Sequence, residues 1–76
     1  MDTLVAESER EANEAQMTYG VHVFARAKLI PDLAIERGEQ AYQRARSLGD
    51  NALEFLAALG TAHAHLDLAD VSQAEQ

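Results

Sequence analysis

Four residues near the carboxyl end of the chain have side chains that can bind metals or move protons. The stretch HAHLDLAD contains His63, His65, Asp67 and Asp70. In a helix, His63, Asp67 and Asp70 would share a face, whereas His65 would point roughly the other way, so the two histidines could not chelate a metal together. Metal binding by His63 with Asp67 is conceivable. The simpler interpretation is that His63 packs against a neighbour and both aspartates cap helices, so we expect no metal and no cofactor.

Groups that could catalyse a reaction are few and scattered. The serines Ser8, Ser47 and Ser72 follow no strand-to-helix turn that would expose a nucleophile, and the chain has no glycine-rich loop to bind a phosphate. His22 is isolated and could be either a surface or a packing residue. Because no nucleophile, base and oxyanion donor are placed to act together, we expect a protein that is not an enzyme.

The composition is that of a small acidic chain without covalent cross-links. Its 76 residues include no cysteine, which excludes disulfides and thiolate metal sites. Hydrophobic residues make up 47% of the chain but aromatic residues only 5%, because alanine and leucine supply most of the apolar content. The formal charge of −7 argues against direct binding to nucleic acid or to an anionic membrane. It is compatible with a basic protein partner.

Neither end of the chain resembles a targeting or membrane segment. The N-terminus is acidic where a signal peptide would be basic, and no apolar run approaches the roughly 20 residues that a bilayer requires. We therefore expect a cytoplasmic protein with no membrane contact.

The residue pattern predicts an all-α protein with a single domain, 1–76. The N-terminal region, 1–29, reads as one long helix or two collinear ones, with Gly20 interrupting a thin apolar stripe. Residues 31–66 form an antiparallel helical hairpin, and 67–76 is the start of a further helix or a tail. The prediction is thus three main helices plus a short C-terminal helical start.

Helix boundaries are marked most clearly around the second helix. Pro31 suits its first turn, and Gly49 is the left-handed residue expected just past its end. Asp50 or Asn51 then caps the third helix, with Glu54 placed to complete something close to a capping box. Because this connection is so short, the second and third helices must pack antiparallel.

Apolar residues lie on most sides of the third helix. Within 52–66 the polar side chains are Glu54, Thr61, His63 and His65. A helix of this kind has to be covered on more than one side, and the chain offers little to cover it. Self-association, as a symmetric dimer, is the economical solution. Gly60 lies inside this helix, where a missing side chain would let a neighbouring helix come close.

Two spacing patterns in the hairpin match the two helices of a known repeat. The first-helix pattern is carried by Leu56, Leu59, Gly60 and His63, and the second-helix pattern by Gly38, Tyr42, Ala45 and Asp50. Both lie in the register of a 34-residue period. The chain therefore resembles a tetratricopeptide-like fragment over about 33–66. Its ARSLGD turn is similar to repeats of large bacterial ATP-dependent transcriptional regulators and related signalling proteins. A non-repeat helical bundle is the alternative.

The same spacing has a physical interpretation. Small residues at Gly38, Ala45 and Gly60 would let helix axes approach, while the larger side chains of Tyr42, Leu56 and Leu59 fill the gaps between them.

The resemblance implies a concave helical surface that binds peptides or partner helices. We expect a protein–protein interaction or scaffold module, within or derived from a regulatory protein, that docks a partner or another copy of itself. The candidate interaction or packing residues are Tyr42, Phe55, Leu56, Leu59, Gly60, His63 and Leu66. The alternative is a stand-alone small acidic regulator, antitoxin-like or an inhibitor, that binds a basic protein partner.

Overall fold

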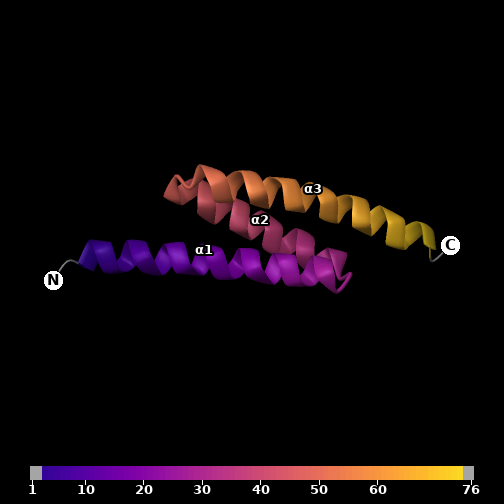
Figure 1. Cartoon of the computed structure of the whole chain (residues 1–76), viewed down its shortest axis with the longest axis horizontal. Coiled ribbons are helices and arrows are strands. Elements are labelled where there is room, and N and C mark those ends of the chain that lie inside the picture. The colour runs from indigo at the N-terminus through magenta and orange to yellow at the C-terminus, as the bar shows by residue number, and fades with distance from the viewer. Residues whose placement is uncertain (1–2, 75–76) are drawn as a thin grey trace.

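The computed structural model describes residues 3–74, which form three α-helices: α1 (Thr3–Ala27), α2 (Pro31–Leu48) and α3 (Asn51–Ala74). Adjacent helices pack antiparallel, as predicted, so α1 and α3 run in the same direction on either side of α2 (Figure 1). Each outer helix packs mainly on α2. The all-α hairpin architecture is therefore confirmed.

The N-terminal region is one continuous helix rather than two. Alanine and glutamate favour helix throughout α1, and the helix continues through Gly20 without a break. The space around Gly20 is open. The first turns of α1 extend beyond the other two helices (Figure 1). Residues 5–11 of α1 are exposed and include acidic side chains.

The end of α2 has the geometry predicted for it. Gly49 adopts the left-handed conformation with φ of 73°. Its N–H donates to the carbonyl of Arg46 at 3.2 Å, and the N–H of Asp50 donates to the carbonyl of Ala45 at 2.9 Å. These two bonds satisfy carbonyls that the helix end would otherwise leave without partners.

Asp50, one of the two predicted caps, begins α3. Its carboxylate accepts a hydrogen bond from the Leu53 N–H at 3.0 Å. Asn51 is consequently the first helical residue, and Glu54 lies one position too far along for the capping box. The capping-box prediction is therefore wrong, although the helix start is correct.

The connection between α1 and α2 repeats this turn without a glycine. Leu29 takes the left-handed position with φ of 59°. The N–H groups of Leu29 and Ile30 donate to the carbonyls of Arg26 and Ala25 at 3.1 and 2.9 Å. Ile30, the residue before Pro31, lies outside the helical region with φ of −113° and ψ of 76°, and Pro31 starts α2 as predicted. A leucine in this conformation is strained by about 1–2 kcal/mol.

The separate C-terminal helical start predicted for 67–76 is wrong for the residues that the structure describes. α3 continues through Asp67 and Asp70 to Ala74, so neither aspartate caps a helix. The physical reason is that 61–74 contains no glycine or proline, and aspartate alone does not interrupt a helix. Residues 75 and 76 lie outside the described range.

The interior is built almost entirely from small residues. Seven of the eight buried hydrophobic residues found within 3–74 are alanines, and Leu53 is the eighth. Gly38 and Gly60 are buried beside them. Buried positions on α2 and α3 follow intervals of four, three and four residues, the spacing of a coiled-coil seam. Such residues bring the helix axes close, but they leave most large apolar side chains outside.

Candidate interaction surface

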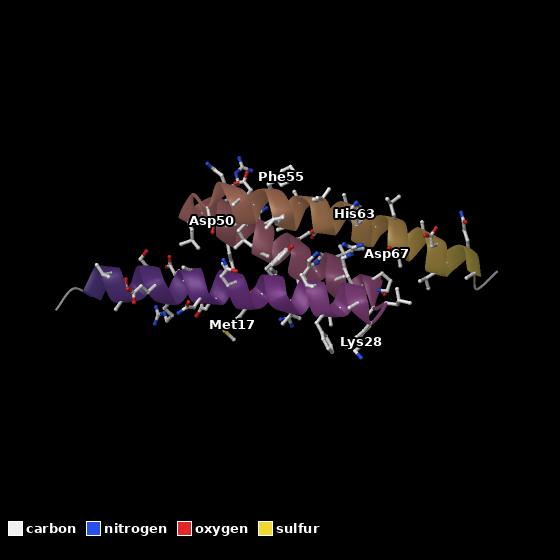
Figure 2. All side chains as sticks on the ribbon, in the orientation of Figure 1. Met17, Lys28, Asp50, Phe55, His63 and Asp67 are labelled. Atoms are coloured by element: carbon white, nitrogen blue, oxygen red, sulfur yellow. The ribbon has the colours of Figure 1, made fainter. Side chains whose placement is uncertain are left out.

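An apolar stripe runs along the outer side of α3. It consists of Phe55, Leu59, Ala62 and Leu66, which share one face because their intervals are close to whole turns. Phe55 is 67% exposed, Leu66 64% and Leu59 44%. Figure 2 shows Phe55 at the outer edge of α3, on the side away from α1. We call these four residues the α3 stripe.

Leu56 and His63 lie beside the α3 stripe on the same helix. Leu56 is as exposed as Leu59, at 44%, and His63 is exposed as well. The structure therefore brings five of the predicted candidates together on the outside of α3: Phe55, Leu56, Leu59, His63 and Leu66. It separates the other two, because Gly60 is buried and Tyr42 is half-buried on α2.

The gap between the buried glycines is filled by a residue that the sequence did not identify for this role. Among residues 3–74, His22 of α1 is the largest fully buried side chain, with 1% of its surface exposed. A methyl group added at Gly60 would collide with its Nε2, and one added at Gly38 would lie 2.8 Å from its Nδ1. The expectation that Tyr42, Leu56 and Leu59 fill this space is wrong, because the imidazole occupies it, while both leucines are exposed and Tyr42 is half-buried elsewhere on α2.

A hydrogen bond fixes the imidazole in this position. His22 Nδ1 lies 2.7 Å from the carbonyl oxygen of Ala34 on α2, and since a carbonyl only accepts, Nδ1 carries the proton and donates. The ring of Tyr19 lies beside it, with the ring centroids 5.7 Å apart. His22 thus joins all three helices: it belongs to α1, bonds to α2 and packs on Gly60 of α3.

The HAHLDLAD stretch is not assembled into a reactive site. Asp67 Oδ2 accepts a bond from Arg26 Nε at 3.3 Å, so its role is an ion pair between α3 and α1. His63, His65 and Asp70 are exposed. Across 3–74, no group of three or more histidine, aspartate or glutamate side chains is placed to hold a metal ion.

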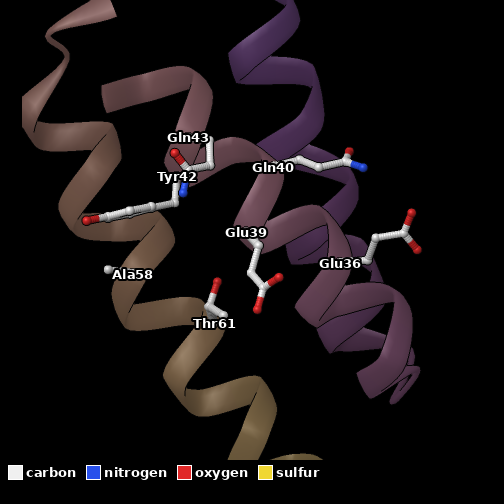
Figure 3. A pocket seen from close by; sticks show the side chains of 7 residues that line it. All are labelled: Glu36, Glu39, Gln40, Tyr42, Gln43, Ala58 and Thr61. Atoms are coloured by element: carbon white, nitrogen blue, oxygen red, sulfur yellow. The ribbon is translucent and has the colours of Figure 1, made fainter. Parts of the chain in front are cut away.

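A shallow hollow of about 570 Å³ separates α2 from α3 on another side of the molecule. Tyr42 extends from α2 across this hollow towards Ala58, and Thr61 lies further along α3 (Figure 3). The hollow is open, and two acidic side chains, Glu36 and Glu39, border it on the α2 side. The α3 stripe, by contrast, contains no charged side chain.

A second group of exposed apolar side chains lies on the opposite edge of the molecule, on α1. Met17 is 71% exposed and Phe24 57% exposed. Lys28 lies over the ring of Phe24, with Nζ 5.7 Å from the ring centroid. Figure 2 places Met17 and Lys28 on the edge opposite Phe55. The α1 edge is thus partly covered by a cation, whereas the α3 stripe is not.

Comparison with known proteins does not add a family to these observations. The chain gave no match to a protein-family model, to a curated protein or to a solved structure. No helix within the described residues combines the length and the apolar character needed to cross a membrane. What these findings establish is a small protein of three α-helices in which adjacent helices pack antiparallel.

Proposed function

We propose that this chain is a protein–protein interaction module that binds through the α3 stripe. The observation that carries the proposal is that small side chains form the interior while large apolar side chains lie on the surface. Alanine, glycine, one leucine and one histidine form the interior, while Phe55, Leu59 and Leu66 remain in contact with solvent. Burying the exposed part of each of these side chains against a second surface gains roughly 1–3 kcal/mol at about 25 cal/mol per Å². An uninterrupted apolar stripe on a small protein is accordingly a docking surface.

The proposal extends to a tetratricopeptide-like arrangement of the hairpin. In support, the three small positions of the repeat pattern, Gly38, Ala45 and Gly60, are all buried at helix contacts. The chain differs from the repeat pattern in the side chain that fills the space beside Gly38 and Gly60. That side chain is His22, which belongs to α1 and not to the hairpin. The chain would then act as a scaffold within a regulatory protein.

A charge placed in the α3 stripe tests the proposed docking. If copies associate through the stripe, thermal stability rises with chain concentration, because association stabilises only the folded state. Leu59→Glu should abolish this dependence, since it buries a carboxylate in the interface. The matched control is His65→Glu, which introduces the same residue on an exposed side of the same helix. Equal behaviour of the two variants would refute a role for the stripe in self-association.

A small acidic regulator remains the second candidate, and one observation favours it. Glu7, Glu9 and Glu11 are exposed in the N-terminal part of α1. A basic partner could bind there by charge attraction. Such binding weakens as ionic strength rises. Titration with a lysine-rich peptide would favour this function if binding were salt-sensitive and lost when all three glutamates were changed to glutamine.

A further inference from the structure

We infer that the occupant of the α3 stripe is a second copy of this chain, with the two α3 helices antiparallel and Phe55 of each copy against Leu66 of the other. The inference rests on the proposed function and adds to it the partner, the orientation and the register. Three properties of the stripe carry it: its spacing, the sizes of its side chains and its lack of charge.

The spacing of the stripe is the same in both directions along the helix. Positions 55, 59, 62 and 66 are separated by four, three and four residues. A second α3 turned end to end therefore presents the same intervals, and all four positions of one copy can meet all four of the other. Seams with this spacing are the ones that pair helices through knobs-into-holes packing.

The sizes of the side chains fit one antiparallel register. With Phe55 opposite Leu66 of the second copy, Leu59 falls opposite Ala62 of that copy, so a large residue faces a small one at the centre. A two-fold axis then relates the copies and each contact occurs twice. A register shifted by a turn in either direction leaves some of the four side chains without a counterpart.

The absence of charge explains how two copies of an acidic chain can meet here. Residues 55–66 contain no aspartate, glutamate, lysine or arginine, although such residues make up 25% of the chain and its net charge is −7. The stripe consequently offers a basic partner no charged group to bind, and it brings no like charges together in a dimer. Charge depletion of this kind is typical of interface centres.

The exposed area sets the strength of this association. With about 100 Å² of apolar surface per leucine side chain and about 200 Å² per phenylalanine, the exposed parts of Phe55, Leu56, Leu59 and Leu66 come to roughly 300 Å² per copy. Two copies bring this to about 600 Å², and even with the adjoining alanines the buried total stays below the lower limit of about 1,000 Å² for specific interfaces. The dimer should accordingly be weak and reversible, and it should form only at micromolar or higher concentrations of the chain.

Spin labels placed beyond the ends of the stripe test the orientation without altering it. The chain contains no cysteine, so Ala52→Cys and Ala69→Cys, both exposed, each give one labelling position. In the antiparallel dimer, a mixture of the two labelled variants should give a distance below about 20 Å between copies. Each variant alone should give about 25 Å or more, because 17 residues of helix at 1.5 Å per residue separate the labels.

The possible results separate the inference from the proposed function. A short distance for labelled Ala52→Cys alone means parallel pairing, which overturns the inference and leaves the stripe as a docking surface. The inference is also overturned, and the stripe again remains a docking surface, if distances between copies are observed but the mixture of the two labelled variants does not give the shortest one. If no distance between copies appears at several hundred micromolar, the second copy is not the occupant and the inference is wrong.

The exchange of two side chains tests the register. The double variant Leu59→Ala/Ala62→Leu keeps one large and one small residue opposite each other, so its dissociation constant should stay within about threefold of the original. Leu59→Ala alone should weaken association at least tenfold. If the double variant is as weak as Leu59→Ala alone, Leu59 does not face Ala62 of the second copy, and the register is wrong even if the chain dimerises.

Discussion

Substitution of Gly60 by alanine tests whether His22 really fills the space between the helices. Two effects oppose each other in this variant. Alanine favours a helix interior over glycine by about 1 kcal/mol. Against this, the new methyl group would collide with Nε2 of the imidazole, whose Nδ1 is held 2.7 Å from the carbonyl oxygen of Ala34.

The collision should exceed the gain in helix propensity. Overpacking a close-packed interior costs about 1–3 kcal/mol, and a displaced imidazole also loses a hydrogen bond worth about 0.5–1.5 kcal/mol. The free energy of unfolding should therefore fall by about 1–2 kcal/mol in Gly60→Ala. For a chain of this size that corresponds to a lower melting temperature by roughly 5–10 °C.

Gly20 provides the matched control, because it is also inside a helix but has open space around it. Gly20→Ala should raise the free energy of unfolding by about 0.5–1 kcal/mol. Both variants are measured by urea unfolding followed by circular dichroism, at one chain concentration so that self-association does not differ between samples.

A double-mutant cycle then identifies the imidazole as the cause. In the His22→Ala background the space beside Gly60 is free, so Gly60→Ala should become stabilising by about 1 kcal/mol. If Gly60→Ala stabilises the otherwise unchanged chain as much as Gly20→Ala does, the packing of His22 between Gly38 and Gly60 is refuted.

Three further predictions concern the helix ends and the contact between α1 and α3. Leu29→Gly should raise the free energy of unfolding by about 1 kcal/mol, because it removes a left-handed leucine (φ 59°), and Gly49→Ala should lower it by a similar amount. Asp50→Ala should lower it by about 1 kcal/mol, since the side chain caps α3 through the Leu53 N–H, whereas Asn51→Ala should have little effect. Asp67→Asn should lower it by less than about 1 kcal/mol, because its ion pair with Arg26 is about a third exposed, and the loss should shrink in 1 M salt. Each is checked by urea unfolding against the unmodified chain.

The connections between helices could be predicted because their signals are local. Pro31, Gly49 and Asp50 act through their own backbone geometry or through bonds to groups a few residues away. The left-handed Leu29 could not be predicted in this way. Nothing in its side chain favours that conformation, and the turn follows from the need of α2 to return along α1 after the break before Pro31.

The continuation of α3 to Ala74 escaped prediction because aspartate has two roles that a sequence does not distinguish. Asp67 and Asp70 suit helix caps, but a cap needs a break in the backbone, and 61–74 contains no residue that causes one. Asp67 instead pairs with Arg26, which is 41 residues away in the chain. A partner at that separation follows from the packing of α1 against α3.

For the candidate site, the sequence pattern predicted that α3 has more apolar surface than the rest of the chain can cover. It did not predict which side of α3 the other helices cover. The residues chosen to fill the gap beside Gly60, Leu56 and Leu59, turned out to face outward. His22 fills this gap because Gly38 on α2 and Gly60 on α3 leave space next to its position on α1. A buried glycine signals that something bulky lies next to it, but the identity of that neighbour depends on the tertiary arrangement.

The central claim is that the large apolar side chains outside this small-residue interior exist to contact another chain. Sedimentation equilibrium of the unmodified chain, from low micromolar to several hundred micromolar, tests it most directly. We predict a reversible shift from monomer to dimer across the micromolar range, and its loss in Leu59→Glu but not in His65→Glu. A cooperatively folded chain that stays monomeric at the highest concentration would contradict self-association through the α3 stripe.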